Sequence, residues 1–356
     1  MAETATLFVG TYTNLGAEGI YTCRMDVDSG MLEQVAVVGG IDNPSFLAVD
    51  PSGEHLYAVC ETHDDEGASD SISAYSIGDD GSLTLLNVES TGGPGPCHLA
   101  VDSTDSYVIV ANYYGGSVCM LPVEADGSLG PRSDFVLHEG SSIDPERQFE
   151  PFAHSVTIDS SNSRAYVCDL GMDKILVYRI DHEQGRLIEE TGLRVSTEPG
   201  HGPRHFAFHP SDRFCYAINE MGSTIAAYEY DSETGRMSQT QLISTLPAGW
   251  SGVTSTADIH VSQDGRFVYG SNRGHDSIAK FSVDPDTGRL TSIGREHTLG
   301  KTPRNFAITP DGRFLLAENQ DSGNIVTFAI DADSGGLEYT GNQISIPGPV
   351  CIQFRP

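Results

Sequence analysis

The sequence predicts an all-β fold, a seven-bladed β-propeller of four-stranded antiparallel blades. One strand-and-turn pattern recurs seven times along the 356 residues, about 50 residues apart, which is a period typical of propeller repeats. The first and last copies are each incomplete, and together they make one whole copy. The 39 Gly and 18 Pro are spread along the chain, as expected for many short strands joined by turns. Because no linker interrupts the pattern, we expect residues 1–356 to form a single domain.

One half of the repeat is a strand that leads into a Gly-x-Leu or Gly-x-Met turn. The hydrophobic residue of this turn occupies seven regularly spaced positions: Leu32, Leu83, Leu129, Leu187, Met237, Leu290 and Leu337. The strand before each turn begins with a β-branched residue: Ile20, Ile72, Val118, Ile175, Ile225, Ile278 and Ile325. β-Branched residues pack well on a pleated sheet, so these segments are expected to be the two outer strands of each blade.

The other half of the repeat is a strand, a tight turn and a second strand. Turns such as Pro310-Asp311-Gly312-Arg313 carry the residues that a tight β-turn requires. Copies of this half begin at Pro44, Pro96, Ala153, Pro203, Thr256 and Pro303. The seventh copy is split, because 349–356 is a first strand with no successor and 6–11 is a second strand with no predecessor. Pairing the chain ends would close the ring and remove two exposed sheet edges.

The chain is strongly acidic, with a formal net charge of −30 from 50 acidic and 20 basic residues. Such a charge repels nucleic acid and anionic membranes, so we expect neither as a partner. The acidity either keeps the protein soluble or adapts it to high salt, where ions screen the self-repulsion.

Cysteine usage and the N-terminus indicate an intracellular protein. The seven cysteines form no C-x-x-C pair and no metal-ligand spacing, as expected in a reducing compartment. The segment 1–4 lacks the basic and apolar regions of a signal peptide, and no apolar run approaches membrane-spanning length. The expected location is therefore the cytoplasm.

Polar residues concentrate where each blade meets the central channel. In an antiparallel pair, the start of the first strand lies beside the end of the second, so residues at these positions gather at one mouth of the channel. The basic and amide residues there include His98, His154, Arg204, His205, Arg273, Arg304, Asn305 and Asn319, and the ends of the second strands also bring Cys60-Glu61, Asn112-Tyr113 and Asn219-Glu220 to this mouth. On an acidic protein, such a cluster attracts a small anion, and the planar fork of arginine suits phosphate or carboxylate. The alternative is that these residues only organise channel water and cap strand ends.

Two long connections are expected on the same face as this mouth. The segment from His138 to Phe152 contains Arg147 and Gln148, and the segment 247–256 carries the only tryptophan, Trp250. Long loops on one face of a rigid scaffold usually shape a site, although they can also simply cover hydrophobic surface.

No metal or cofactor site is indicated by the sequence. His201, His205 and His209 are spaced like ligands, but residues four apart on a strand are separated by roughly 13 Å, too far to share one ion. Asp258 and His260 lie on one face of a strand, either as a polar pair or, as we favour, as buried support for Arg273.

Several motifs along the whole chain resemble the seven-bladed lactonase family, which includes propeller-type 6-phosphogluconolactonases and the fungal carboxy-cis,cis-muconate cyclase. The motifs are Phe8-Val9-Gly10-Thr11-Tyr12, Gly202-Pro203-Arg204-His205, Asn219-Glu220, Ala257-Asp258-Ile259-His260 and Pro303-Arg304-Asn305. The resemblance implies an active site built from His154, Arg204, Glu220 and Arg273. Their position at the same mouth, or on the long loop beside it, makes six further polar residues candidates for binding the substrate: His205, Arg304, Asn305, His98, Asn319 and Gln148. Among them, Asn305 and Asn319 occupy positions that vary within the family.

The activity implied by this resemblance is hydrolysis of a sugar lactone, above all 6-phosphogluconolactone in the pentose phosphate route. Opening a lactone requires a base to activate water and positive charge to stabilise the oxyanion. Glu220 is the first choice for the base and His154 the second, while Arg204 and Arg273 would hold the phosphate or polarise the carbonyl. A carboxymuconate-type cyclase or lactonase and a non-catalytic binding propeller remain alternatives. The sequence leaves the oligomeric state open.

Overall fold

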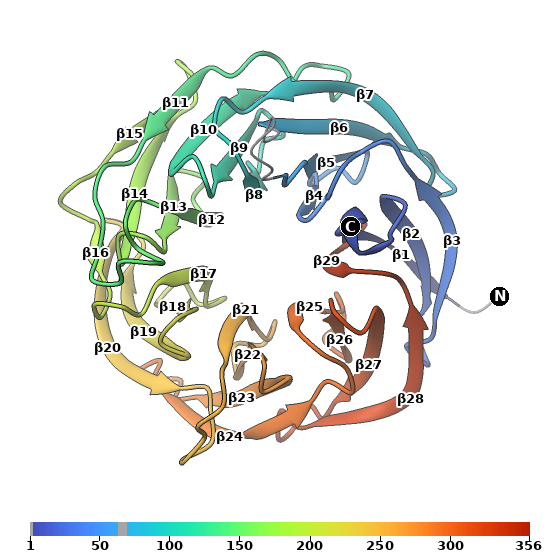
Figure 1. Ribbon diagram of the computed structural model, residues 1–356, viewed down its shortest axis with the longest axis vertical. Coiled ribbons are helices and arrows are strands. Elements are labelled where there is room, and N and C mark those ends of the chain that lie inside the picture. Colours follow the sequence, from blue (N-terminus) through green and yellow to red (C-terminus); the bar gives the residue numbers. More distant parts are fainter. Residues whose placement is uncertain (1–2, 63–69) are drawn as a thin grey trace.

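Seven four-stranded units form a closed ring in the computed structural model, which describes residues 3–62 and 70–356 (Figure 1). Within each unit the strands are antiparallel and run in chain order from the centre of the ring to its rim. The predicted seven-bladed β-propeller is therefore confirmed.

We number the blades from the one that contains both chain ends and give their strands from the centre outward. Blade 1 comprises β29 (Pro349–Phe354), β1 (Thr4–Thr11), β2 (Ile20–Asp26) and β3 (Leu32–Val38), with the short 3-10 helix η1 (Thr13–Leu15) after β1. Blade 2 comprises β4 (Leu47–Val49), β5 (His55–Val59), β6 (Ser71–Ile77) and β7 (Leu83–Ser90). Blade 3 comprises β8 (Pro96–Val101), β9 (Tyr107–Asn112), β10 (Ser117–Pro122) and β11 (Asp134–Leu137).

The remaining blades repeat this arrangement. Blade 4 comprises β12 (Ala153–Ile158), β13 (Arg164–Asp169), β14 (Lys174–Asp181) and β15 (Arg186–Glu189), with β16 (Val195–Ser196) also paired to β14. Blade 5 comprises β17 (Pro203–Phe208), β18 (Phe214–Asn219), β19 (Thr224–Asp231) and β20 (Arg236–Ser244). Blade 6 comprises β21 (Ser255–Val261), β22 (Phe267–Arg273), β23 (Ser277–Val283) and β24 (Leu290–His297). Blade 7 comprises β25 (Pro303–Ile308), β26 (Phe314–Asn319), β27 (Asn324–Ile330) and β28 (Leu337–Ser345).

The two chain ends pair within blade 1, as predicted from the split repeat. Strand β29 lies antiparallel to β1, with Leu7 opposite Phe354 and Gly10 opposite Cys351. In Figure 1 the last, red strand lies beside the first, blue strand and completes the ring. This pairing leaves neither strand as an open inner edge.

Hydrophobic contacts lie between neighbouring blades rather than in one central core. Ile109 and Met120 of blade 3, for example, pack in one buried cluster with Val156 and Val167 of blade 4. Each sheet is therefore apolar on both faces, which explains the long buried runs in the middle strands. The arrangement makes the ring rigid and leaves its centre to polar residues.

The third copy of the repeat departs from the prediction. Leu129 does not begin the outer strand; it forms a single bridge with Val123, and β11 begins only at Asp134. Pro122 and Pro131 flank this segment, and proline cannot donate the hydrogen bonds of a continuing ladder. The side chain of Leu129 instead fills the core between blades 2 and 3.

Candidate active site

A β-bulge recurs near the start of the inner strands and directs several of the predicted site residues towards one mouth of the channel. In blades 3, 4, 5 and 7 the register shifts across one residue, which is left without a direct partner on the second strand. The skipped residues are Cys97, His154, Arg204 and Arg304. A bulge re-aims its side chain and is frequent beside active sites, and here it brings four different residues towards one mouth of the channel.

Three of these residues, Cys97, His154 and Arg304, line a polar pocket of about 290 Å³ at the mouth. Its described lining is Glu61, Cys97, Tyr113, Tyr114, Arg147, His154, Glu220, Ser255, Arg273 and Arg304. A narrower cavity shares Glu61, Cys97, His154 and Arg304 with the pocket, and Arg204, His205 and Asn305 also line it. The predicted convergence of His154, Arg204, Glu220 and Arg273 is thus present in the structure.

Three arginines surround the carboxylate of Glu220. Arg147 Nη2 lies 2.6 Å from Oε1, while Arg204 Nε and Arg273 Nη2 lie 3.0 and 2.8 Å from Oε2. Burial alone would raise the pKa of Glu220, but the charges of Arg273, Arg204 and Arg147 outweigh it and hold the pKa far below its usual range. Glu220 is therefore ionised and fully engaged by its partners.

The fourth arginine faces the pocket from blade 7. Arg304 Nη2 lies 3.8 Å from Glu61 Oε1, and its guanidinium stacks over the ring of Tyr12, whose hydroxyl donates to Glu61. The pocket and the narrower cavity together thus combine four arginines with the two carboxylates of Glu61 and Glu220, an excess of positive charge. Burial and the charges of Arg304 and Arg273 lower the pKa of Arg204 to about 9, as this crowding predicts.

His154 is the buried residue of the pocket that keeps an unused polar atom. It is 4% exposed, and its Nδ1 has no hydrogen-bond partner. Its ring lies edge-on to those of Tyr113 and His205, with centroids 5.3 and 5.4 Å away. Burial, and then the charges of Arg204 and the other nearby cations, lower the pKa of His154 well below its ordinary value. The imidazole is therefore neutral at neutral pH, with a nitrogen available to accept a proton.

Asp258 organises the residues beneath the pocket. Its Oδ1 lies 2.7 Å from His205 Nδ1, and its Oδ2 lies 2.8 Å from His260 Nε2 and 2.5 Å from Asn305 Nδ2. His205 Nε2 in turn lies 3.1 Å from Arg204 Nη1. The polar pair of Asp258 and His260 is therefore present.

The favoured role of that pair, support for Arg273, is wrong. Asp258 contacts His205 and Asn305, whereas Arg273 is held by Glu220 and by the carbonyl of Thr256. The reason is that the bulge in β21 turns Asp258 towards the inner strands of blades 5 and 7, away from the end of its own β22.

Of the residues predicted to bind substrate, Arg304 lines the pocket, His205 and Asn305 line only the narrower cavity, and the other three lie outside the described lining of both. His98 stacks on Phe46 at a centroid distance of 3.9 Å. Gln148 is completely buried and donates to the carbonyl of Leu170, which fixes the loop that carries it. Asn319 donates to the carbonyl of Thr298. Their contacts indicate structural roles.

The spaced histidines contact separate partners, as expected from strand geometry. His201 Nδ1 lies 3.1 Å from Thr224 Oγ1, His205 contacts Asp258, and His209 Nε2 lies 2.8 Å from the carbonyl of Gly265. Among residues 3–62 and 70–356, no group of three His, Cys, Asp or Glu side chains could hold a metal ion.

Several pocket residues received no role from the sequence, namely Glu61, Cys97, Tyr113, Tyr114 and Ser255. Glu61 and Tyr113 follow the second strands of blades 2 and 3, so the rule that located Glu220 also applied to them. Arg147 was placed in a site-shaping loop, but its pairing with Glu220 was not foreseen, because loop geometry does not follow from the repeat.

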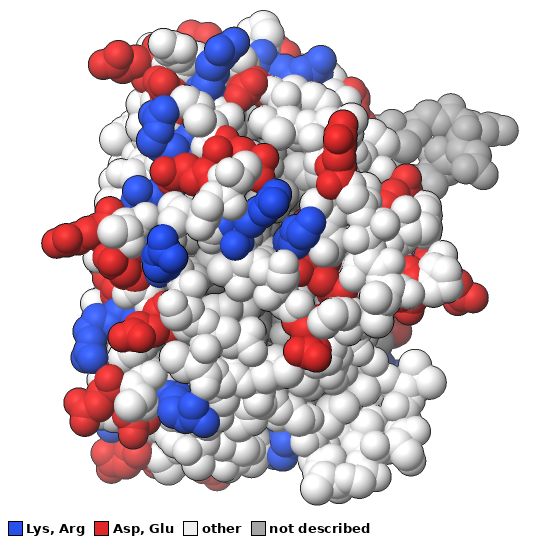
Figure 2. Space-filling view, turned by 90° about the vertical axis from the view of Figure 1, so that its left-hand side faces the viewer, with Lys and Arg blue, Asp and Glu red and all other residues white. Residues whose placement is uncertain are grey.

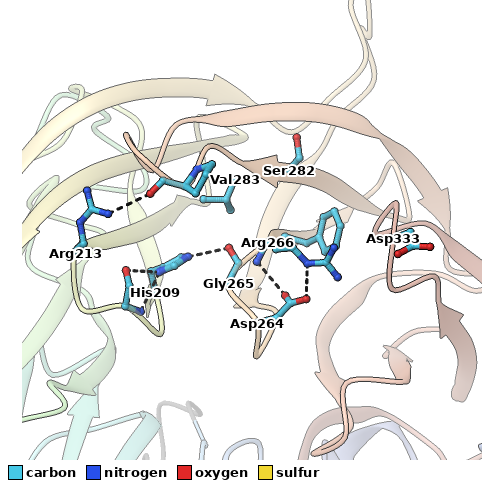
Figure 3. A pocket seen from close by; sticks show the side chains of 11 residues that line it. His209, Arg213, Asp264, Gly265, Arg266, Ser282, Val283 and Asp333 are labelled. Carbon is cyan, nitrogen blue, oxygen red and sulfur yellow. Dashed lines mark hydrogen bonds and ion pairs between the residues drawn. The ribbon is translucent and has the colours of Figure 1, made fainter.

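A larger cavity, of about 500 Å³, lies between the turns of blades 5 and 6 (Figure 3). Its basic side chains already have protein partners. Arg213 donates to the carbonyls of Pro285 and Asp286, His209 contacts the carbonyl of Gly265, and Arg266 pairs with Asp264. These contacts use the basic groups of the cavity within and between neighbouring turns, and Asp333 adds a further negative charge to its lining.

Outside the pocket, basic side chains are dispersed among acidic ones. Figure 2 shows both signs intermixed over the rim on the side of blades 4 and 5. The contrast with the four arginines gathered around the pocket and the narrower cavity marks these spaces as the most basic part of the described surface. No helix in the described part of the chain is long and apolar enough to cross a membrane.

A family model described as lactonase, seven-bladed β-propeller, matches residues 6–354. The chain belongs to this lactonase family. It is 37% identical to the 6-phosphogluconolactonase of Bacillus subtilis over 98% of this chain and 97% of that protein. It is also 33% identical to the 6-phosphogluconolactonase of Formosa agariphila, over 85% of this chain and 86% of that one. The solved periplasmic gluconolactonase of Pseudomonas aeruginosa superposes with a TM-score of 0.94 at 33% identity, over 99% of each chain.

Proposed function

We propose that this lactonase hydrolyses 6-phosphogluconolactone to 6-phosphogluconate, as a step of the pentose phosphate route, and that it needs no metal ion. The observation that carries the proposal is that the pocket and the narrower cavity together hold four arginines, two carboxylates and a neutral histidine whose Nδ1 has no hydrogen-bond partner. Arginine forks bind phosphate and stabilise a developing oxyanion, and a neutral imidazole can take a proton from water.

His154, rather than Glu220, is the proposed base. A carboxylate held by three guanidinium groups has little tendency to accept a proton, whereas the imidazole of His154 lines the pocket and is held neutral. Water attacks the lactone carbonyl while its proton passes to His154, and the carbonyl electron pair becomes an oxyanion beside the arginines. When the intermediate collapses, the bond to the ring oxygen breaks and that oxygen takes the proton back from His154.

Glu220 has a different role in this scheme. It orients Arg204 and Arg273 through one oxygen and Arg147 through the other, and it keeps the three like charges together. Removing its charge would leave the guanidinium groups to repel one another.

The direct test is hydrolysis of 6-phosphogluconolactone above the rate of a buffer blank, since the substrate also opens unaided. We expect His154→Gln to lower kcat by about 10²- to 10⁴-fold, the contribution typical of a general base. Arg204→Ala and Glu220→Ala should lower kcat/KM as well. Wild-type hydrolysis no faster than the blank, or unchanged rates in these variants, would remove the proposal.

The same assay should include a carboxymuconate-type lactone, because carboxylates suit the arginines as well as phosphate does. Faster turnover of that lactone would replace the proposed substrate while leaving the class of reaction intact.

The proposed location is the cytoplasm. All seven cysteines are buried and free, as expected in a reducing compartment. Cell fractionation with a periplasmic marker enzyme would test this, and recovery with the marker would contradict it.

A further inference from the structure

Arg147 differs from the other arginines of the pocket in how it is held. Arg204, Arg273 and Arg304 lie on strands β17, β22 and β25, whereas Arg147 lies on the connection between blades 3 and 4. This connection is nevertheless ordered by its own polar contacts. Asp144 Oδ1 accepts from the backbone N–H of Arg147, and the buried side chain of Gln148 donates to the carbonyl of Leu170. The loop therefore presents Arg147 in a defined position.

Arg147 is also the outermost of the four arginines. Its side chain is 46% exposed, compared with 18% for Arg304, 16% for Arg273 and 2% for Arg204. The candidate base His154 lies at the buried end of this gradient. An elongated ligand with its reacting carbonyl beside His154 would therefore extend its far end towards Arg147.

The contacts of Glu220 with Arg204 and Arg273 do not involve Arg147. Arg204 and Arg273 both bind Oε2, whereas Arg147 binds Oε1 through a single nitrogen, Nη2. A guanidinium has five N–H donors in a planar fork, and Glu220 and Tyr113 take only part of this capacity. Arg147 can thus bind a second anion while it remains beside Glu220.

We propose that Arg147 is a specificity-determining residue that binds the anionic group remote from the lactone carbonyl and so selects phosphorylated sugar lactones over neutral ones. The inference rests on the proposed lactonase function and deepens it. The competing role is purely structural: Arg147 would only help to hold Glu220, and its loss would then affect every substrate alike.

The experiment compares kcat/KM for 6-phosphogluconolactone and for unphosphorylated glucono-δ-lactone, each corrected for the buffer blank. Arg147→Met removes the charge and keeps most of the aliphatic stem, while Arg147→Lys keeps the charge. Arg236→Met is the matched control, because Arg236 begins β20 on the outer edge of blade 5 and is exposed.

In wild type the phosphorylated lactone should be preferred. Arg147→Met should reduce that preference by about 10- to 100-fold, mainly through a higher KM for the phosphorylated substrate, as expected for a lost charge-assisted contact. Arg147→Lys should restore part of the preference, and Arg236→Met should leave it within about twofold of wild type. An equal loss for both lactones in Arg147→Met, or an unchanged preference, would overturn the inference.

A binding measurement separates failure of this inference from failure of the proposed function. If wild type hydrolyses neither lactone above the blank, the lactonase proposal fails, and Arg147 is judged by calorimetric titration with 6-phosphogluconate and gluconate. Tighter binding of 6-phosphogluconate by wild type, lost in Arg147→Met, would still support the inference. Binding of neither compound, or the same preference in both proteins, would contradict it.

Discussion

Lowering the pH from 7 to 5 should destabilise the protein through histidines that the fold keeps neutral. Burial lowers the pKa of His98, His154 and His205, in the last case to about 4, with Arg204 adding to the effect on all three. The unfolded chain takes up protons at these residues near pH 6.5, whereas the folded protein does not. Their contribution to stability is therefore complete above pH 6.5 and declines as the pH falls.

The magnitude follows from proton linkage. A histidine that stays neutral in the folded state loses about 2 kcal/mol of stability between pH 7 and 5, so three lose about 6 kcal/mol. Two groups act in the opposite direction. Burial and then Asp258 raise the pKa of Glu318, and Asp258 raises that of His260 against the effect of burial. Because the folded protein holds these protons more tightly, they offset part of that loss. The net loss is therefore smaller than about 6 kcal/mol.

Urea denaturation followed by circular dichroism at pH 7, 6 and 5 would measure this loss, with 0.5 M KCl present to screen the acidic surface. The sharpest comparison is between wild type and His154→Gln. The variant lacks one neutral histidine, so its loss should be smaller by about 2 kcal/mol. If wild type and variant respond identically, His154 is not held neutral by the fold, and its proposed role as a base loses its electrostatic foundation.

Three further predictions concern the ring and its surface. Asp258→Ala should lower the free energy of unfolding by about 3–5 kcal/mol, because His205, His260 and Asn305 lose their shared buried partner; a urea midpoint near that of wild type would contradict this. Deleting residues 349–356 should abolish the cooperative thermal transition, because β1 loses its inner neighbour, whereas a single sharp transition in the truncated chain would show that closure is dispensable. The melting temperature should rise between 0.1 and 2 M KCl if the charge of −30 is an adaptation to salt, and a constant or falling value would favour a role in solubility alone.

The propeller architecture was predictable because it depends on the spacing at which one strand-and-turn pattern recurs along the chain. Seven copies of one pattern, with complementary halves at the two ends, require only that hydrophobic residues and turns recur at fixed spacing. The departure at Leu129, which does not begin an outer strand, also follows from reliance on spacing. A Gly-x-Leu match does not take into account that Pro122 and Pro131 prevent the hydrogen-bond ladder from continuing.

The sequence predicted which residues gather at the site better than it predicted which of their side chains contact one another. Strand order alone brings His154, Arg204 and Glu220 to one mouth, and the structure contains that convergence. Which side chain meets which depends on the bulges and on the loop that carries Arg147, and neither is encoded in the repeat spacing. The sequence therefore placed Glu220 first and His154 second as candidates for the base, and the three arginine contacts of Glu220 are the reason why we propose His154 instead.

The circular arrangement has a consequence for when activity can first arise. The pocket and the side chains that support it come from every blade, from Tyr12 and Glu61 at the start of the chain to Arg304 near its end. Strand β29, which completes the ring, follows every other described strand in the chain. A nascent chain that still lacks β29, or one that a protease has cut before it, has most of the reactive groups but no assembled site. Catalysis in this lactonase should therefore begin only after β29 has been made and has paired with β1.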